Sequence, residues 1–78
     1  MVDVINAKYI KDYLIEIEFS DYKKCVIDFK EYSTRDGIFK QLKDLDFFKK
    51  FSINHDIGTI CWDNGLDIAP ETLYSKIS

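Results

Sequence analysis

The chain has 78 residues, of which 46% are hydrophobic and 15% aromatic, and this predicts one folded domain spanning residues 1–78. Eleven basic against fourteen acidic residues give a formal net charge of −3, so direct nucleic-acid binding is disfavoured. No apolar run approaches the roughly 18 residues of a membrane-spanning helix, and the N-terminus lacks a secretion-signal pattern. We therefore expect a cytoplasmic protein that does not associate with membranes.

The cysteine and histidine content is too low for a disulfide scaffold or a recognisable metal motif. Cys25 and Cys61 are the two cysteines, and their spacing matches no zinc pattern. We interpret both as reduced, buried thiols and expect no metal and no other cofactor.

The N-terminal third predicts strands. Residues Val2 to Ile10 mix β-branched and polar side chains, and a first strand there could place Val2, Val4 and Ile5 on one side. From Tyr13 to Phe19 apolar and acidic residues alternate as in a half-buried strand. The apolar face holds Ile15, Ile17 and Phe19, and the polar face holds Glu16 and Glu18.

A second alternating run completes a hairpin. Residues 20–23 form a turn signal, and the run from Lys24 to Phe29 places Val26 and Asp28 on the polar face. The opposite face holds Cys25, Ile27 and Phe29.

The middle of the chain predicts helix. Glu31 to Gly37 reads as a loop or a single helical turn, with Ser33 and Thr34 as candidate caps. One continuous helix would bury Ile38, Leu42, Leu45 and Phe48. The alternative is a break at Asp44, which would cap a shorter helix from Leu45 to Lys50, and we favour this shorter helix.

The last third predicts a second hairpin and a helix. Phe51 and Ile53 lead into a turn at residues 54–58, and Thr59 to Trp62 returns as a strand. Asn64-Gly65 is typical of a type I′ turn, in which both central residues have positive φ. Pro70 suits the first position of a helix, which Glu71 at its positive end and the Leu73–Ile77 pair would support.

These elements predict an α+β fold. We expect a small antiparallel sheet of four to five strands, built from two hairpins, with one middle helix and a short C-terminal helix in the order β-β-β-α-β-β-α.

Three carboxylates, Asp63, Asp67 and Glu71, recur every four residues and could serve acid–base chemistry or a hard cation. They straddle a turn and a helix start, where such side chains commonly bond backbone amides or complement the helix dipole. We therefore favour structural roles for all three.

The remaining candidates for chemistry also have plainer interpretations. His55 is the single imidazole and could pair with a cysteine nucleophile, but it lies in a turn-forming cluster typical of surface positions. Trp62 could stack on a base or anchor a protein partner, and we favour a core position. The lysines of residues 40–50 are interrupted by Asp44 and Asp46, which is typical of a solvated helix face. We expect no enzymatic activity.

The segment from Trp62 to Tyr74 reads W-x-N-G-x-D-x-x-P-E-x-L-Y and resembles a small bacterial family catalogued as domain of unknown function 2442. The likeness extends backward through the first hairpin, residues 46–48 and residues 58–60. Tyr22 departs from it, since relatives often have glycine there, and this leaves the type of the first hairpin turn open. The signature residues, for structural or interaction roles, are Trp62, Asn64, Gly65, Asp67, Pro70, Glu71, Leu73 and Tyr74.

The resemblance implies a compact α+β domain with an antiparallel sheet, and no established catalytic activity. Relatives occur alone, joined to helix-turn-helix domains, or beside genes that look like toxins. We expect a non-enzymatic protein-interaction module, with an antitoxin-like role toward a small basic protein as one form of it. The alternative is an accessory domain in DNA-binding transcriptional regulation, acting as a homodimer or with a separate DNA-binding chain. Because the chain ends at Ser78, we expect no appended DNA-binding domain.

Overall fold

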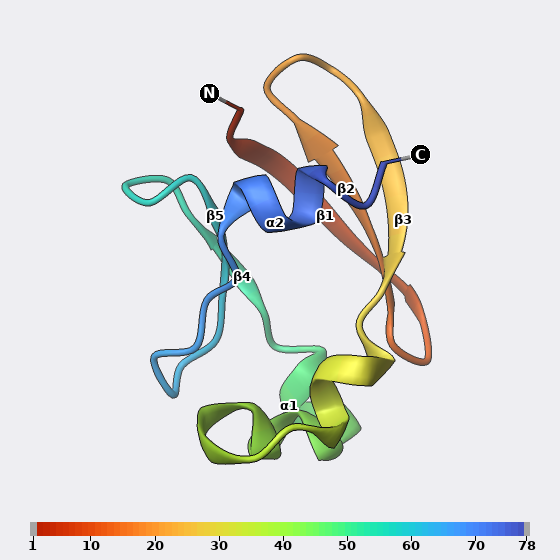
Figure 1. The fold of residues 1–78 in the computed structure, drawn as a ribbon, viewed down its shortest axis with the longest axis vertical. Helices are drawn as coiled ribbons and strands as arrows, with labels where there is room; N and C mark the ends of the chain where they lie inside the picture. The colour runs from red at the N-terminus through yellow and green to blue at the C-terminus, as the bar shows by residue number, and fades with distance from the viewer. Residues whose placement is uncertain (1, 78) are drawn as a thin grey trace.

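Three antiparallel strands form the main sheet. The computed structural model describes residues 2–77. Strands β1 (Val4–Lys11), β2 (Leu14–Phe19) and β3 (Lys24–Asp28) lie in the order β1-β2-β3 (Figure 1). Alternation in β2 is confirmed, because Ile15, Ile17 and Phe19 are all fully buried. In β3, Ile27 is buried whereas Val26, on the opposite face, is 51% exposed.

A bulge explains the imperfect alternation of β1. Val4 lies opposite Phe19 and Asn6 opposite Glu18, so Ile5 has no partner on β2. The extra residue shifts the strand's two-residue period by one. Val4 therefore shares the core face with Ala7 and Tyr9, while Ile5 is 40% exposed and its predicted place beside Val4 is wrong.

The middle of the chain forms three short helical segments. These are the 3₁₀ helices η1 (Lys30–Thr34) and η2 (Gly37–Lys43) and the α-helix α1 (Leu45–Phe48). The Asp44 carboxylate accepts hydrogen bonds from the amides of Asp46 and Phe47, at 3.0 and 3.4 Å. The break at Asp44 and the shorter, capped helix are therefore confirmed.

Two details of that region differ from the prediction. Ile38 is 46% exposed, because residues four apart do not share a face when the helix has three residues per turn. Ser33 and Thr34 are not caps, since their hydroxyls donate back to the carbonyls of Lys30 and Glu31.

A second hairpin and a C-terminal helix complete the fold. Strands β4 (Ser52–Asn54) and β5 (Thr59–Cys61) form a separate two-stranded sheet, and α2 (Pro70–Tyr74) begins at its proline. The α+β class and the element order are confirmed, with the strands divided between two sheets. Within residues 2–77, every helix is too short or too polar to cross a membrane.

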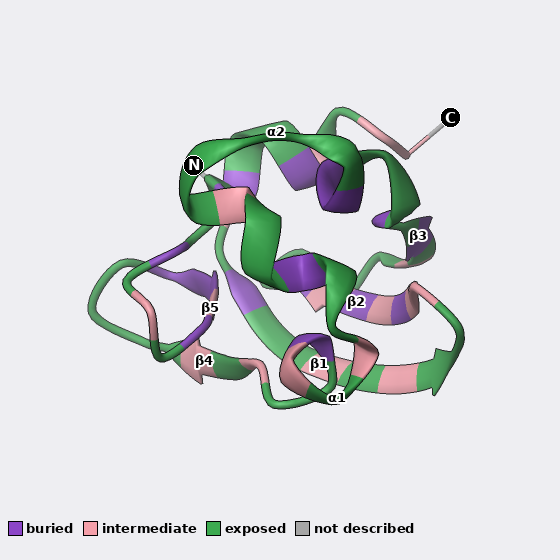
Figure 2. Ribbon diagram, turned by 90° about the horizontal axis from the view of Figure 1, so that it is seen from below, coloured by how far each residue is buried: buried purple, intermediate pink, exposed green. Residues whose placement is uncertain are grey.

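The core lies between the main sheet, the helical segments and α2, and Figure 2 marks the buried residues that each of these elements contributes. Phe48 is at its centre. Its ring lies 4.8 to 6.3 Å, centroid to centroid, from the rings of Tyr9, Tyr13, Phe29 and Trp62. Cys25 and Cys61 are free thiols, but both are partly exposed, so the prediction that they are buried is wrong.

Candidate interaction surface

The turn after β5 is a three-residue loop. The Gly65 amide donates to the Trp62 carbonyl at 3.1 Å, and the Trp62 amide donates to the Leu66 carbonyl at 2.9 Å. Gly65 has a φ of +90°, whereas Asn64 is not among the residues with positive φ. This is a type I turn followed by one left-handed residue, and the type I′ prediction is wrong. The Asn64 side chain accepts from the Leu66 amide at 3.0 Å, which stabilises the turn with only one residue at positive φ.

Trp62 and Asn64 fasten this turn to the helical segments. The Trp62 indole is buried, and its Nε1 donates to the Phe48 carbonyl at 2.9 Å. The Asn64 amide nitrogen donates to the Ile38 carbonyl and to Gln41 Oε1, both at 3.1 Å. Two signature residues therefore join segments more than a dozen residues apart in the chain.

Tyr74 makes a similar connection at the other end of the molecule. Its hydroxyl donates to Asp21 Oδ2 at 2.6 Å, and its ring packs edge-on against Phe19 at 5.0 Å. The Tyr74 hydroxyl, and then the Lys23 amide, lower the pKa of the Asp21 carboxyl below its usual value. Tyr74, followed by the charge of Asp21, raises the pKa of Lys23.

The turn between β2 and β3 repeats the loop after β5. The Tyr22 amide donates to the Phe19 carbonyl at 2.8 Å, and the Phe19 amide donates to the Lys23 carbonyl at 2.9 Å. Tyr22 takes the place that Gly65 has in the other turn, with a φ of +70°. This identifies the turn that the sequence left open and leaves an aromatic side chain 79% exposed at its tip.

The other signature residues divide into buried and exposed positions. Pro70 and Leu73 lie on the buried face of α2, whereas Glu71 is exposed in the first turn of the same helix. Asp67 is exposed, and its backbone is bridged to Cys61. The buried and hydrogen-bonded signature residues hold the fold together, and Asp67 and Glu71 are free to meet solvent or a partner.

The residues considered for chemistry lie at the surface. Asp63, Asp67 and Glu71 are all exposed, and residues 2–77 hold no group of three His, Cys, Asp or Glu arranged to bind a metal ion. His55 is exposed in the turn between β4 and β5. That turn is stabilised by Asn54, whose side chain accepts from the amides of the residues that follow His55.

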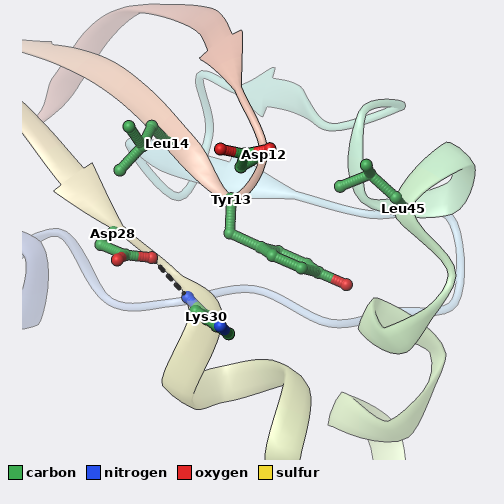
Figure 3. Close-up of a pocket in the computed structure, with 6 residues that line it drawn as sticks. All are labelled: Asp12, Tyr13, Leu14, Asp28, Lys30 and Leu45. Carbon is green, nitrogen blue, oxygen red and sulfur yellow. Dashed lines mark hydrogen bonds between the residues drawn. The ribbon is translucent and has the colours of Figure 1, made fainter.

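An open depression of about 380 Å³ lies at one end of the main sheet (Figure 3). Two of its polar side chains already have local partners. The Tyr13 hydroxyl donates to the Leu42 carbonyl at 2.7 Å, and Asp28 accepts from the Lys30 amide at 2.9 Å. Its lining residues are Asp12, Tyr13, Leu14, Asp28, Lys30 and Leu45, none of them a predicted site residue.

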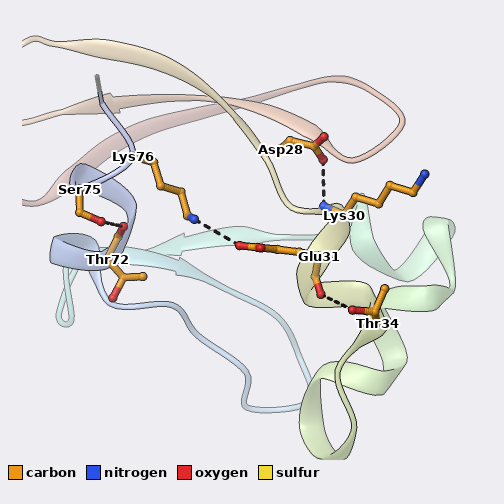
Figure 4. Close-up of polar contacts among 7 residues, drawn as sticks. All are labelled: Asp28, Lys30, Glu31, Thr34, Thr72, Ser75 and Lys76. Carbon is orange, nitrogen blue, oxygen red and sulfur yellow. Dashed lines mark hydrogen bonds and ion pairs between the residues drawn. The ribbon is translucent and has the colours of Figure 1, made fainter.

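Charged side chains form few contacts with one another. Among residues 2–77 the ion pair found joins Lys76, just after α2, to Glu31 of η1 at 3.4 Å (Figure 4). Nearby hydroxyls bond backbone carbonyls: Ser75 donates to Thr72, and Thr34 donates to Glu31. No other pair of oppositely charged side chains lies within ion-pair distance in the described part of the chain.

These charges are unevenly distributed. Residues 51–75 contain no Lys or Arg, and residues 23–50 contain eight Lys or Arg against five Asp or Glu. Strands β4 and β5 and the turn after them lie together along one side of the molecule, at the left of Figure 1. We call the four exposed acidic residues of 51–75 the acidic side; they are Asp56, Asp63, Asp67 and Glu71.

Asp63, Asp67 and Glu71 were recognisable from their regular spacing, whereas Asp56 was not. The signal that was available is the run of 25 residues, from 51 to 75, without a single lysine or arginine. The exposure of Val26 on β3 was also readable, because alternation sets it opposite Ile27.

The model of a family described as "Protein of unknown function (DUF2442)" matches residues 4–78. Neither a curated protein nor a solved structure matches the chain.

Proposed function

We propose that this chain, which belongs to the DUF2442 family, is a non-enzymatic protein-interaction module that binds a small basic protein through its acidic side. The observation that carries the proposal is the unpaired negative charge of residues 51–75. All four acids are exposed, and none has a cationic partner among residues 2–77. Opposite electrostatic potentials on two protein surfaces speed their association and favour the partner of matching charge.

The geometry of the acidic side suits a rigid docking surface. Asp63 belongs to a turn that Asn64 and Trp62 fasten to the helical segments. Glu71 begins a helix that Tyr74 fastens to the first hairpin. Fixed acids lose little conformational freedom on binding, so more of the electrostatic attraction is retained as affinity.

An antitoxin-like role is the finer form of the proposal. It is motivated by the net charge of −3 and by the genomic setting that the family resemblance implies. In that role the module would bind, and thereby block, a basic toxin encoded beside it.

Capture from a lysate of the native host tests the proposal. The test variant carries Asp56→Asn, Asp63→Asn, Asp67→Asn and Glu71→Gln. The control variant carries Asp12→Asn, Glu16→Gln, Glu18→Gln and Asp46→Asn, which changes the net charge equally on segments outside residues 51–75. We expect wild type and control to retain a basic protein that the test variant loses. If all three capture the same proteins, the proposal is wrong.

The accessory role in DNA-binding regulation is the second proposal. It is favoured by the net positive charge of residues 23–50, which could lie near phosphate in a complex assembled by another chain. A mobility-shift assay at low salt, with the product of the neighbouring gene present and absent, tests it. A shift that requires this protein would support the role, and its absence under both conditions would contradict it.

A further inference from the structure

The outer edge of β3 is a strand edge without a partner. β3 pairs with β2 alone among residues 2–77, and Figure 1 shows it at the end of the sheet farthest from β1. The edge of β1 is different, because the Val4 amide donates to the Gly58 carbonyl beside the second hairpin. An exposed edge presents a row of backbone donors and acceptors to any strand of matching register.

The hydrogen-bonding pattern identifies the residues that form this row. Phe19 donates to the Lys23 carbonyl, and Phe29 donates to the Tyr13 carbonyl, so residues 23 and 29 point toward β2. Between them the register is regular, and bonding alternates along an antiparallel strand. The backbone groups of Lys24, Val26 and Asp28 therefore point away from the sheet.

The charges on this edge are self-complementary. Antiparallel pairing of two β3 strands about Val26 sets Lys24 of each copy opposite Asp28 of the other, and Val26 opposite Val26. The same register aligns the three outward-pointing residues with one another, which allows about six backbone hydrogen bonds. Lys24 and Asp28 are exposed, and neither forms an ion pair within residues 2–77.

We propose that a second copy of this chain binds along β3, giving a two-fold dimer with a continuous six-stranded sheet. Cross-strand pairs of opposite charge stabilise such an edge, and Val26, at 51% exposure, gains an apolar neighbour. The contact is isologous, so it closes after two copies. Because the contact is a single short strand edge, we expect it to bury less than the roughly 1,200 Å² of stable interfaces. We therefore expect a dissociation constant between about 1 µM and about 1 mM.

Charge exchange at the two positions tests the pairing. Lys24→Asp places two acids opposite each other, and Asp28→Lys places two lysines there, so each variant alone should be monomeric. A mixture of the two restores both complementary pairs and should form a heterodimer.

Sedimentation equilibrium from about 10 µM to about 1 mM measures this association, over a range set by the expected affinity. Asp36→Lys with Lys40→Asp, exposed charges on another segment, is the control and should behave as wild type. A wild type that stays monomeric throughout, or no gain on mixing, would overturn the proposal.

A proline tests the edge independently of charge. The Val26 amide points away from β2, so Val26→Pro removes an outward donor while the β2–β3 pairing is kept. We expect this variant to be monomeric. A dimer that survives in a folded Val26→Pro protein would place the interface elsewhere.

Disulfide formation tests the register. In a hydrogen-bonded antiparallel pair the two Val26 Cα atoms would lie about 5.5 Å apart, within the range that a disulfide spans. We expect Val26→Cys, in a Cys25→Ser and Cys61→Ser background, to cross-link two copies under mild oxidation. Ile57→Cys in the same background, similarly exposed, should not. Equal cross-linking by the control, or faster cross-linking through wild-type Cys25, would contradict the register.

Discussion

Tyr22 holds a backbone conformation that favours glycine, with a φ of +70° and a side chain 79% exposed. The left-handed conformation costs a residue with a Cβ atom roughly 1–2 kcal/mol, and glycine loses about 0.5–1 kcal/mol more entropy on folding. We therefore expect Tyr22→Gly to raise the free energy of unfolding by about 0.5–1 kcal/mol, measured by urea denaturation. Tyr22→Ala removes the ring and keeps the strain, and should change stability little. A Tyr22→Gly protein less stable than Tyr22→Ala would show that the conformation is not strained.

The hydrogen bond from Tyr74 to Asp21 makes the stability of the fold depend on pH. Because the pKa of Asp21 is lowered on folding, its contribution to stability is present above the unfolded value near 3.8 and is lost as pH falls through the lower folded value. Tyr74→Phe removes the main cause of that shift. We expect the stability difference between wild type and Tyr74→Phe to be largest near neutral pH and to narrow below about pH 3.8.

Tyr9→Phe is the matched control, since the Tyr9 hydroxyl donates to the Asp12 carbonyl and not to a carboxylate. Its stability difference from wild type should stay constant over the same acid range. A Tyr74→Phe difference as constant as that of Tyr9→Phe would contradict the role assigned to Asp21.

At the scale of elements, Asn64 joins the turn after β5 to η2. Asn64→Asp keeps the acceptor for the Leu66 amide but replaces the donor to the Ile38 carbonyl and Gln41 with an acceptor. We expect it to lower the free energy of unfolding by about 1–2 kcal/mol, because the hydrogen bond to the Ile38 carbonyl becomes a repulsive contact between two acceptors. Asn6→Asp adds the same charge where the side chain only accepts, from the Ala7 amide, and should cost less than about 0.5 kcal/mol. The measurement is chemical denaturation. If Asn64→Asp and Asn6→Asp lose the same free energy of unfolding, Asn64 does not stabilise the contact between the turn and η2.

Strands and caps were readable from local patterns. The alternation of Ile15, Ile17 and Phe19 depends on one face being buried, and the Asp44 cap depends on the amides directly after it. Each of these features depends only on residues close together in the chain, so each can be predicted from one short stretch of sequence. The two hairpins and the proline-started α2 followed from the same kind of pattern.

The misjudged features depend on partners distant in sequence or on small differences in backbone conformation. The bulge at Ile5 is defined by β2, and the exposure of Ile38 follows from a 3₁₀ helix that apolar spacing does not distinguish from an α-helix. Asn64-Gly65 suits two turn types, and the choice depends on contacts with η2. The ties formed by Trp62 and Tyr74 span 14 and 53 residues, and no local pattern announces them.

At the scale of the whole molecule, most signature residues are buried or hydrogen-bonded within the fold. Binding of a partner is therefore expected at other, exposed residues. Two surfaces stand out: the acidic side of residues 51–75 and the free edge of β3. They belong to different segments, so dimerisation and binding of a basic protein can be tested separately. A variant monomeric through Val26→Pro should still bind the basic partner.

Binding of a basic protein by the acidic side should depend on its four carboxylates and on the salt concentration. Isothermal titration calorimetry tests this most directly. The captured partner is titrated against wild type and against the four-acid variant, each at low and at physiological salt. We predict that neutralising Asp56, Asp63, Asp67 and Glu71 weakens binding by about tenfold or more at low salt, and that raising the salt weakens wild type far more than the variant. Equal affinities for the two proteins, with equal responses to salt, would contradict the account.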